Sequence, residues 1–348
     1  MWNNITAAPI ITEIPSEAYV VLQKLAAKWT DILDARDLSL EQLKGAMTNK
    51  VYACQWERDN GNRPRKVLVR VYGGASDLFF NRADEVLTFE RMSQKNQGPR
   101  LLGRFPNGRV EEFLRARTLT AVEMRDSKLS QAIAVKLLEF HQLDIPGTAT
   151  IKLWDRLRDW LRKALILSPT EQSLEIGLNK MDLEIADLEK RLSRPGEKIG
   201  FCHNDLQYGN IMISEKDDSI TIIDYEYASY NPVAFDIANH FCEMTADYHS
   251  DYPHILDFSK YPDMEEQQRF VKTYLEASGQ EVTDREIESL MSEVEEYVLA
   301  SHLQWALWGI MSAAFSEIDF NFMEYAQQRL VEYHRLKRVL FLCGSSNN

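Results

Sequence analysis

The feature that most constrains this chain is a polar segment enclosed by apolar runs. FCHNDLQYGNIMI spans residues 201–213, and ITIIDYEY spans residues 220–227. Polar side chains in such surroundings cost free energy unless they are paired or bind a ligand. The segment therefore predicts either a hydrogen-bonded turn or a site for a charged ligand.

The spacing of three polar residues favours the ligand site. His203, Asp205 and Asn210 follow the pattern H-x-D-x-x-x-x-N, which places a carboxylate and an amide metal ligand on one loop in kinase-type phosphoryl transfer. Asp224 lies 14 residues after Asn210, enough for a strand, a turn and a second strand. The pattern predicts that Asp205 accepts a hydroxyl proton and that Asn210 and Asp224 hold Mg²⁺. His203 is expected to hydrogen-bond the loop backbone. A solvated loop holding these residues by chance is the alternative, and it does not explain why two apolar strands bring all three to neighbouring loop ends.

Size and charge restrict the partners. A chain of 348 residues can form one large domain or two lobes. The formal net charge of −13 argues against a nucleic-acid partner and against general affinity for anionic lipids. The cysteines lack C-x-x-C spacing, and the N-terminus has no basic start followed by an apolar core. These features predict reduced thiols, no zinc site and a cytoplasmic location.

Residues 298–315 are mostly apolar and about as long as a membrane span. They include Ser301, His302, Gln304 and Ser312, and acidic residues precede them. A buried helix of a globular core is therefore expected in place of a transmembrane helix.

The periodicity of apolar residues divides the chain near residue 115. Before it, helices are expected over 16–44 and 81–95, with strands in LKGAMTNKVYACQW, in RKVLVRVYG (65–73) and on both sides of a Phe-Pro-Asn-Gly turn. After it, helices are expected over 129–141, 151–167, 171–193 and within 262–340. The polar segment should form two short strands joined by the acidic turn SEKDDS. The pattern predicts a smaller α+β lobe, 1–115, and a larger, mainly helical lobe, 116–348.

The stretch FCHNDLQYGNIMI…IDYEYASYNPVAFDIANHFCEM resembles the choline/ethanolamine kinase family, and within it the choline kinase branch. The resemblance extends to RKVLVRVYG, GPRLLGRFPNGRVEEFL, LASHLQWALWGI and EIDFNFMEYAQQR. It implies a two-lobed protein-kinase-like fold, with a small mixed β-sheet N-lobe that binds nucleotide and a large helical C-lobe that carries catalysis and choline binding.

The resemblance also implies an ATP site. It assigns Gly45, Thr48 and Asn49 to a loop over the phosphates, in which Ala46 stands where the family more often has a glycine. By the same resemblance, Arg70 is the basic residue that contacts the phosphates, and Glu85 is the family's pairing acid. The segment Glu112, Phe113 and Leu114 holds adenine, and Gln207 contacts the nucleotide from the catalytic loop.

Choline is a quaternary ammonium that lacks N–H donors, so its site requires aromatic faces and nearby negative charge. Trp305 and Trp308 are three residues apart and share a helix face, a spacing that plain core packing also produces. The resemblance implies an aromatic box of Trp305, Trp308, Tyr248 and Tyr325, with Glu243 beside it. Asp236 is expected either to support the catalytic loop or to cap a helix.

The leading interpretation is an Mg·ATP-dependent choline kinase that produces phosphocholine and ADP, the first step of the CDP-choline route to phosphatidylcholine. An ethanolamine kinase or a dual enzyme is the alternative, although HNDLQYGN, Cys242 and Tyr248 favour choline. An antibiotic phosphotransferase and a catalytically silent binding module fit the residues less well. Family members are often dimers, so the resemblance leaves a homodimer open.

Overall fold

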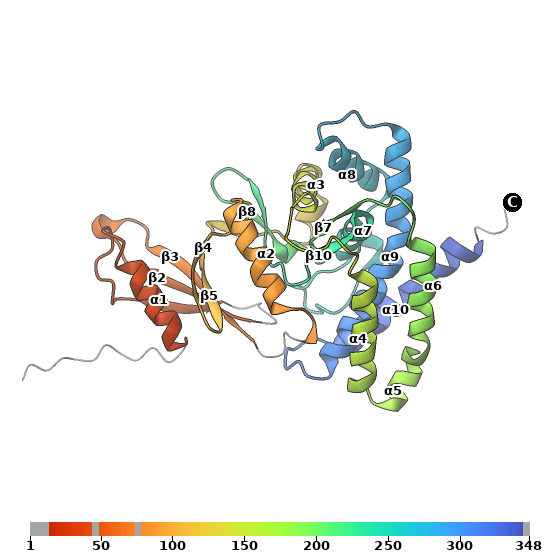
Figure 1. Cartoon of the computed structure of the whole chain (residues 1–348), viewed down its shortest axis with the longest axis horizontal. Helices are drawn as coiled ribbons and strands as arrows, with labels where there is room; N and C mark the ends of the chain where they lie inside the picture. The colour runs from red at the N-terminus through yellow and green to blue at the C-terminus, as the bar shows by residue number, and fades with distance from the viewer. Residues whose placement is uncertain (1–13, 44–48, 74–77, 344–348) are drawn as a thin grey trace, which may run out of the picture. The chain divides into compact units, whose positions relative to one another are not determined.

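The computed structural model describes residues 14–43, 49–73 and 78–343. The chain forms two compact units, residues 1–115 and residues 116–348, and each is described by itself. Figure 1 labels their helices and strands.

Unit 1 is built on a five-stranded sheet with the order β1-β2-β3-β5-β4. Each neighbouring pair runs antiparallel. The strands are β1 (Ser39–Leu43), β2 (Asn49–Trp56), β3 (Arg65–Tyr72), β4 (Leu101–Phe105) and β5 (Gly108–Glu112). Two helices accompany the sheet, α1 (Ser16–Ala26) and α2 (Arg82–Gln94).

Helix α1 packs against β4 and β5 through its apolar face. The alternation of β2 and β3 buries one set of side chains against this helix, including Trp56, Val67 and Val69. Gly103 permits the close approach, because a Cβ atom there would lie 2.4 Å from Cγ1 of Val21.

The prediction of one helix over residues 16–44 is wrong beyond Ala26, since β1 occupies Ser39–Leu43. Tertiary contacts replace the helix. The Trp29 ring meets Trp56 edge-on at 5.2 Å, and Asp31 pairs with Arg65. These partners lie far along the chain, so local periodicity could not indicate them.

Unit 2 is mainly helical. Its helices are α3 (Ser127–His141), α4 (Leu153–Leu167), α5 (Thr170–Glu175), α6 (Met181–Leu192), α7 (Val233–Glu243), α8 (Met264–Glu276), α9 (Asp284–Ala313) and α10 (Phe322–Arg338). Helix α9 packs against α7 and α10, and α3 packs against α8 (Figure 1). All of α7 is buried, so this short helix forms the centre of the unit.

Two small antiparallel sheets complete unit 2. One pairs β7 (Ile199–Cys202) with β10 (Ser229–Pro232), and the other joins β6 (Ala116–Thr118), β8 (Ile211–Ser214) and β9 (Ile220–Ile222). The predicted strands around the acidic turn are β8 and β9. The residues of the H-x-D-x-x-x-x-N pattern connect β7 to β8 and so join the two sheets.

The predicted helix over 171–193 is interrupted. Helix α5 ends at Glu175, and α6 begins at Met181. Gly177 lies between them with φ of +72°, a left-handed conformation that ends a helix and suits glycine.

The apolar stretch near residue 300 lies in the second half of α9, and the acidic residues before it form the first half. A capping box of Thr283 and Glu286 starts this helix. The prediction of a buried helix is confirmed, because eighteen residues of α9 are buried within the unit. Among the described residues, no helix has the length and apolar character needed to span a membrane.

Candidate active site

The loop after β7 is fixed by its histidine. His203 Nε2 donates to the backbone oxygen of Ile223 at 2.9 Å, which ties the loop to the end of β9. Burial lowers the pKa of His203, so the ring is neutral near pH 7 and acts as a hydrogen-bonding group. This role agrees with the sequence-based expectation.

Asn204 takes a left-handed backbone conformation with φ of +64°, which asparagine tolerates better than most residues. Its amide nitrogen donates to the backbone oxygens of Cys202 at 3.1 Å and Tyr227 at 2.7 Å. Its amide oxygen accepts a bond from Asn231 at 2.9 Å. One side chain thus joins the loop, β10 and the segment after β9.

Asp236 on α7 binds the backbone of the loop that follows β7. Its two oxygens accept the backbone N–H groups of His203 and Asn204, both at 2.7 Å. His141 Nε2 lies 2.9 Å from Oδ2, and His141 Nδ1 lies 2.7 Å from the Tyr274 hydroxyl. Burial acts to raise the pKa of Asp236, but the bonds from His141 and His203 keep it below its ordinary value. Of its two expected roles, the structure therefore supports the one at the catalytic loop.

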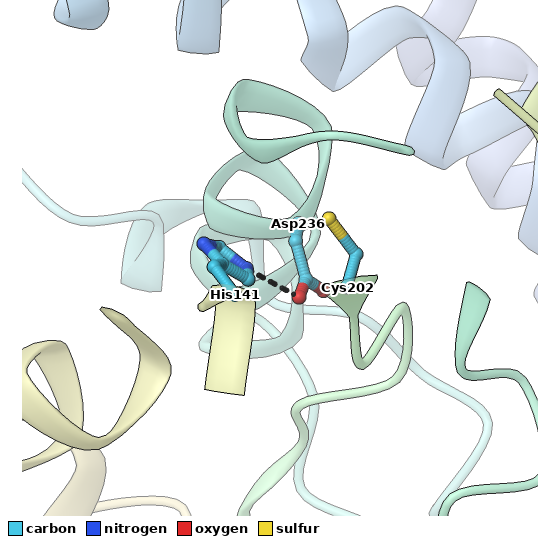
Figure 2. Close-up of side chains that lie close together, drawn as sticks. All are labelled: His141, Cys202 and Asp236. Atoms are coloured by element: carbon cyan, nitrogen blue, oxygen red, sulfur yellow. Dashed lines mark hydrogen bonds and ion pairs between the residues drawn. The ribbon is translucent and has the colours of Figure 1, made fainter. Parts of the chain in front are cut away.

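Figure 2 shows Asp236 with His141 and Cys202, whose potential metal-ligating atoms lie within 4.8 Å of one another. Each of them already has a protein partner. The Cys202 thiol donates to backbone oxygens, including that of Asn231 at 3.3 Å, and burial raises its pKa well above the ordinary value. A metal would need a thiolate. We therefore interpret the cluster as support for the loop.

Asp205 and Asn210 face each other across the loop. Asn210 Nδ2 donates to the Asp205 side chain at 2.9 Å and to its backbone oxygen at 2.8 Å. Because the nitrogen of Asn210 is engaged, its Oδ1 atom is the one suited to coordinate a metal.

The pairing of β8 with β9 brings the segment that contains Asp224 alongside Asn210. Ile211 of β8 pairs with Ile222 of β9, and Ile223 N donates to the Asn210 backbone oxygen at 2.9 Å. Asp224 follows with φ of +67°. Left-handed residues other than glycine carry strain and concentrate at functional sites.

Acidic groups crowd Asp205. Burial raises its pKa well above the ordinary 3.8, and Glu243, Asp224 and Glu226 raise it further, while the bond from Asn210 lowers it. Carboxylates brought together in this way favour a cation among them. The oxygen-rich set of Asp205, Asn210 and Asp224 therefore fits a hard divalent ion.

Of the four predicted aromatic residues, Trp305, Trp308 and Tyr325 form one group, and Tyr248 packs against Phe320, which also contacts Tyr325. The rings of Trp305 and Trp308 meet edge-on with centroids 5.6 Å apart, and Trp308 lies 6.1 Å from Tyr325. Tyr227 completes this group, because its ring lies 5.5 Å from Trp305 and its hydroxyl accepts from Trp308 Nε1 at 3.1 Å. The sequence patterns did not indicate Tyr227 as a member of this group, although it lies only three residues after Asp224.

Glu243 is not an isolated negative charge. Arg329 Nη2 donates to its Oε1 at 2.7 Å, and the Tyr248 hydroxyl donates to its Oε2 at 2.7 Å. Arg329 also donates to the Tyr325 hydroxyl at 2.9 Å. This buried arginine lies 86 residues from Glu243 in the sequence, and no local pattern indicated it.

In unit 1, the predicted phosphate loop is only partly described. Gly45 and Thr48 lie outside the described residues. Asn49 begins β2, is 7% exposed and accepts a bond from Arg82 at 3.2 Å.

The predicted basic and acidic nucleotide residues belong to a buried charge network. Arg70 on β3 donates to Glu111 at 3.0 Å, and Glu85 on α2 accepts from Arg109 at 2.7 Å. Arg109 also donates to Glu111 at 2.7 Å. Arg109 and Glu111 alternate with buried apolar neighbours on β5, so they gave no sequence signal.

The predicted adenine segment begins at Glu112, the last residue of β5. Glu112 pairs with Arg100 at 3.0 Å, and Lys66 lies 5.3 Å from the Phe113 ring. Leu114 is partly buried.

Gln207 caps the short 3₁₀ turn after Asp205 by accepting from the Gly209 backbone N–H at 2.6 Å. A Cβ atom at Gly209 would lie 2.9 Å from this amide oxygen, so a side chain there would displace the capping amide. Gln207 therefore shapes the catalytic loop.

Comparisons with known proteins identify the family of the chain. The family model for choline/ethanolamine kinase matches residues 40–334. "Probable choline kinase 2" of Arabidopsis thaliana is 53% identical over 92% of this chain and 91% of its own length. "Probable ethanolamine kinase" of the same plant is 36% identical over 98% of this chain and 90% of its own length.

A solved structure of a choline kinase has the same fold as this chain. The choline kinase of Cryptosporidium parvum superposes with a TM-score of 0.76 at 26% identity, covering 94% of this chain and 97% of that one. The prediction of a protein-kinase-like fold is confirmed. From its fold, its family-model match and its relatives, the chain belongs to the choline/ethanolamine kinase family.

Proposed function

We propose that this protein is an ATP-dependent choline kinase, which transfers the γ-phosphoryl group of ATP to the choline hydroxyl and releases phosphocholine and ADP. One observation carries the proposal. In unit 2, the loop ends of β7, β8 and β9 present Asp205, Asn210 and Asp224, and an aromatic group rich in indoles and phenols lies in the same unit.

Asp205 is proposed to accept the proton of the choline hydroxyl. Asn210 holds its carboxylate from one side, so the free oxygen has a fixed direction. A base fixed in this way lowers the entropic cost of reaction. The bonds from Asp236 to the loop backbone keep the base in place.

Asn210, through Oδ1, and Asp224 are proposed to hold Mg²⁺. When bound, Mg²⁺ would offset the negative charge that develops on the phosphoryl oxygens. The acidic residues that raise the pKa of Asp205 support this assignment, because they provide a negative field for the ion.

The aromatic group is proposed to bind the trimethylammonium group. Trp305, Trp308 and Tyr325, with Tyr227, supply ring faces for cation–π contact. Tyr248, which donates to Glu243, is proposed to line the same site. Because Arg329 pairs with Glu243, the attraction for a cation comes mainly from the rings and from Asp205, Asp224 and Glu226.

The pairing of Glu243 with Arg329 favours choline over ethanolamine as the substrate. A primary ammonium group donates three hydrogen bonds and needs acceptors. Both oxygens of Glu243 already accept bonds, one from Arg329 and one from Tyr248. A methylated nitrogen requires no such acceptor. The higher identity to a protein named a choline kinase than to one named an ethanolamine kinase agrees with this preference.

Unit 1 is proposed to bind the nucleotide through Asn49, Arg70, Glu85 and the segment 112–114, with Gly45 and Thr48 in the phosphate loop. Gln207 is proposed to contribute from the catalytic loop. A homodimer and a cytoplasmic location remain predictions from the sequence.

The test is turnover of purified protein with Mg·ATP and either choline or ethanolamine, followed by ADP release and by detection of the phosphorylated product. We expect phosphocholine to form and kcat/KM for choline to exceed that for ethanolamine. A higher kcat/KM for ethanolamine would overturn the substrate assignment. Absence of phosphorylation of both would overturn the proposed function.

A further inference from the structure

We propose that Asn239 is a positioning residue that couples the orientation of the choline-binding indole to the backbone of the catalytic base. Asn239 lies on α7, and its side chain is fully buried. Its Oδ1 atom accepts from Trp305 Nε1 at 2.6 Å and from the Ser301 hydroxyl at 2.9 Å. Its Nδ2 atom donates to the backbone oxygen of Asn204 at 3.3 Å.

The direction of these bonds is fixed by chemistry. An indole nitrogen can only donate, so the Asn239 atom facing Trp305 must be the amide oxygen. The amide nitrogen then faces the Asn204 carbonyl, which can only accept. A flipped amide would place donor against donor and acceptor against acceptor in the buried interior, which costs free energy. Asn239 therefore has one stable orientation.

The two groups that Asn239 joins affect different parts of the proposed reaction. The Asn204 carbonyl belongs to the peptide bond that precedes Asp205, so its direction sets the position of the proposed base. The bond to Trp305 sets the tilt of the indole and thus the ring face that a quaternary ammonium meets. Two hydrogen bonds through one amide join these features.

Other contacts make the connection stiff. Asn204 is already fixed by Asp236 and by its bond to the Tyr227 carbonyl. Trp305 is 5% exposed and packs edge-on against Tyr227. A rotation of the indole is therefore transmitted to the loop, since the close packing of buried side chains leaves little room for other adjustments.

This inference rests on the proposed function, because it assumes that Trp305 contacts choline and that Asp205 is the base. A buried asparagine that merely satisfies core hydrogen bonds is the competing interpretation. Such a residue would affect stability and total activity, but it would not link the effect of one indole N–H to the loop.

A double-mutant cycle separates the two interpretations. Trp305→Phe keeps an aromatic ring and removes the N–H donor. Asn239→Leu, at similar volume, removes the bonds to Trp305 and Asn204 together with the bond from Ser301. We expect Trp305→Phe to raise KM for choline about two- to tenfold, the range for loss of one hydrogen bond, and to leave KM for ATP unchanged. We expect Asn239→Leu to raise the same KM and also to lower kcat.

The double variant is decisive. We expect its KM for choline to rise less than the product of the two single effects, because the bond that Trp305→Phe removes is already absent in Asn239→Leu. Trp308→Phe is the matched control, since it removes an indole N–H that bonds to Tyr227 and not to Asn239. Its effect on KM should multiply with that of Asn239→Leu. If the Trp305→Phe effect multiplies in the same way, the coupling does not exist and the proposal is overturned.

Hydrogen exchange tests the coupling without catalysis. Trp305→Phe should speed amide exchange in the peptide that contains residues 203–206 at least about twofold more than Trp308→Phe does. Equal exchange in the two variants would overturn the coupling even if choline is a substrate. If wild-type protein phosphorylates no choline but the exchange difference is present, the proposed function fails and the coupling stands.

Stability is controlled separately. Ile185→Val on α6 removes a buried methylene far from these side chains in sequence and should lower the unfolding midpoint by an amount similar to that for Trp305→Phe. It should leave KM for choline and loop exchange unchanged. If it changes both as Trp305→Phe does, the effects reflect general destabilisation and the proposal is overturned.

Discussion

Glu111 in unit 1 and Asp205 in unit 2 are desolvated carboxylates with opposite surroundings. Arg70 and Arg109 donate to Glu111 and lower its pKa below the ordinary 4.5, although burial acts to raise it. Burial raises the pKa of Asp205, and Glu243 and other acidic groups raise it further. The negative charge of a carboxylate that is paired with arginines is balanced within the protein. The negative charge of a carboxylate that lies among other acids is balanced only when a cation or a proton binds.

The difference separates two uses of buried charge. In unit 1, the ion pairs hold β3, β5 and α2 together. In unit 2, the neutral amide of Asn210 donates to Asp205, and Asp236 accepts from the two backbone N–H groups that precede it. The carboxylate of Asp205 is proposed to take part in the reaction. Substitution of Glu111, which is proposed for no contact with a substrate, should therefore reduce stability, and substitutions of Asp205 and Asp224 should reduce turnover.

The largest expected effect is on stability. Glu111→Gln leaves two guanidinium groups with reduced compensation and should lower the free energy of unfolding by about 3 kcal/mol or more, as for removal of one partner of a buried pair. Urea unfolding followed by circular dichroism measures this. Asp34→Asn, which removes an exposed acid, is the control and should leave the midpoint unchanged. Equal midpoints for the two variants would show that the network around Glu111 adds nothing to stability.

The second effect is on catalysis. Asp224→Asn keeps the size of the side chain and removes a charge proposed to hold Mg²⁺, so kcat should fall about 10²–10³-fold, the range for loss of one transition-state contact. Steady-state turnover with saturating choline and ATP measures this. Asp217→Asn, in the exposed turn between β8 and β9, is the matched control and should keep wild-type kcat. Loss of activity in both variants, or in neither, would contradict the assignment.

The third effect is on choline affinity. Trp305→Ala removes an aromatic face and should weaken choline binding by about 0.5–2 kcal/mol, the range for a cation–π contact, with KM for ATP unchanged. Kinetics with each substrate varied in turn measures this. A similar rise in both KM values would place Trp305 in the structural core alone.

The smallest effect concerns pH. Because the pKa of Glu111 is lowered in the folded state, its contribution to stability is present above the ordinary pKa of 4.5 and is lost as pH falls through the lowered value. Wild-type protein should therefore lose more stability than Glu111→Gln does as the pH falls below about 5. Parallel stability curves for the two proteins would contradict the charge pairing.

Sequence patterns indicated the catalytic loop and its strands because their signals are local. The spacing of Asp205 and Asn210, the apolar runs of β8 and β9 and the indole spacing of Trp305 and Trp308 all lie within short windows. The fold class followed from the same periodicities together with the family resemblance.

Other features depend on partners far apart in the chain. Arg329 pairs with Glu243 across 86 residues, and Trp305 bonds Asn239 across 66. No periodicity marks such pairs, because each residue only has to fit its own element. The end of α1 and the break at Gly177 were missed because tertiary contacts and one left-handed residue outweighed helical spacing.

The role of Asp205 is tested most directly by single-turnover kinetics of Asp205→Asn with saturating Mg·ATP and choline. Asparagine keeps the bond from Asn210, so the loop geometry should persist while the proton acceptor is lost. We expect the rate of phosphocholine formation to fall about 10²–10⁴-fold, the usual contribution of a general base, with nucleotide binding retained. A rate within about tenfold of wild type would contradict the assignment of Asp205 as the catalytic base.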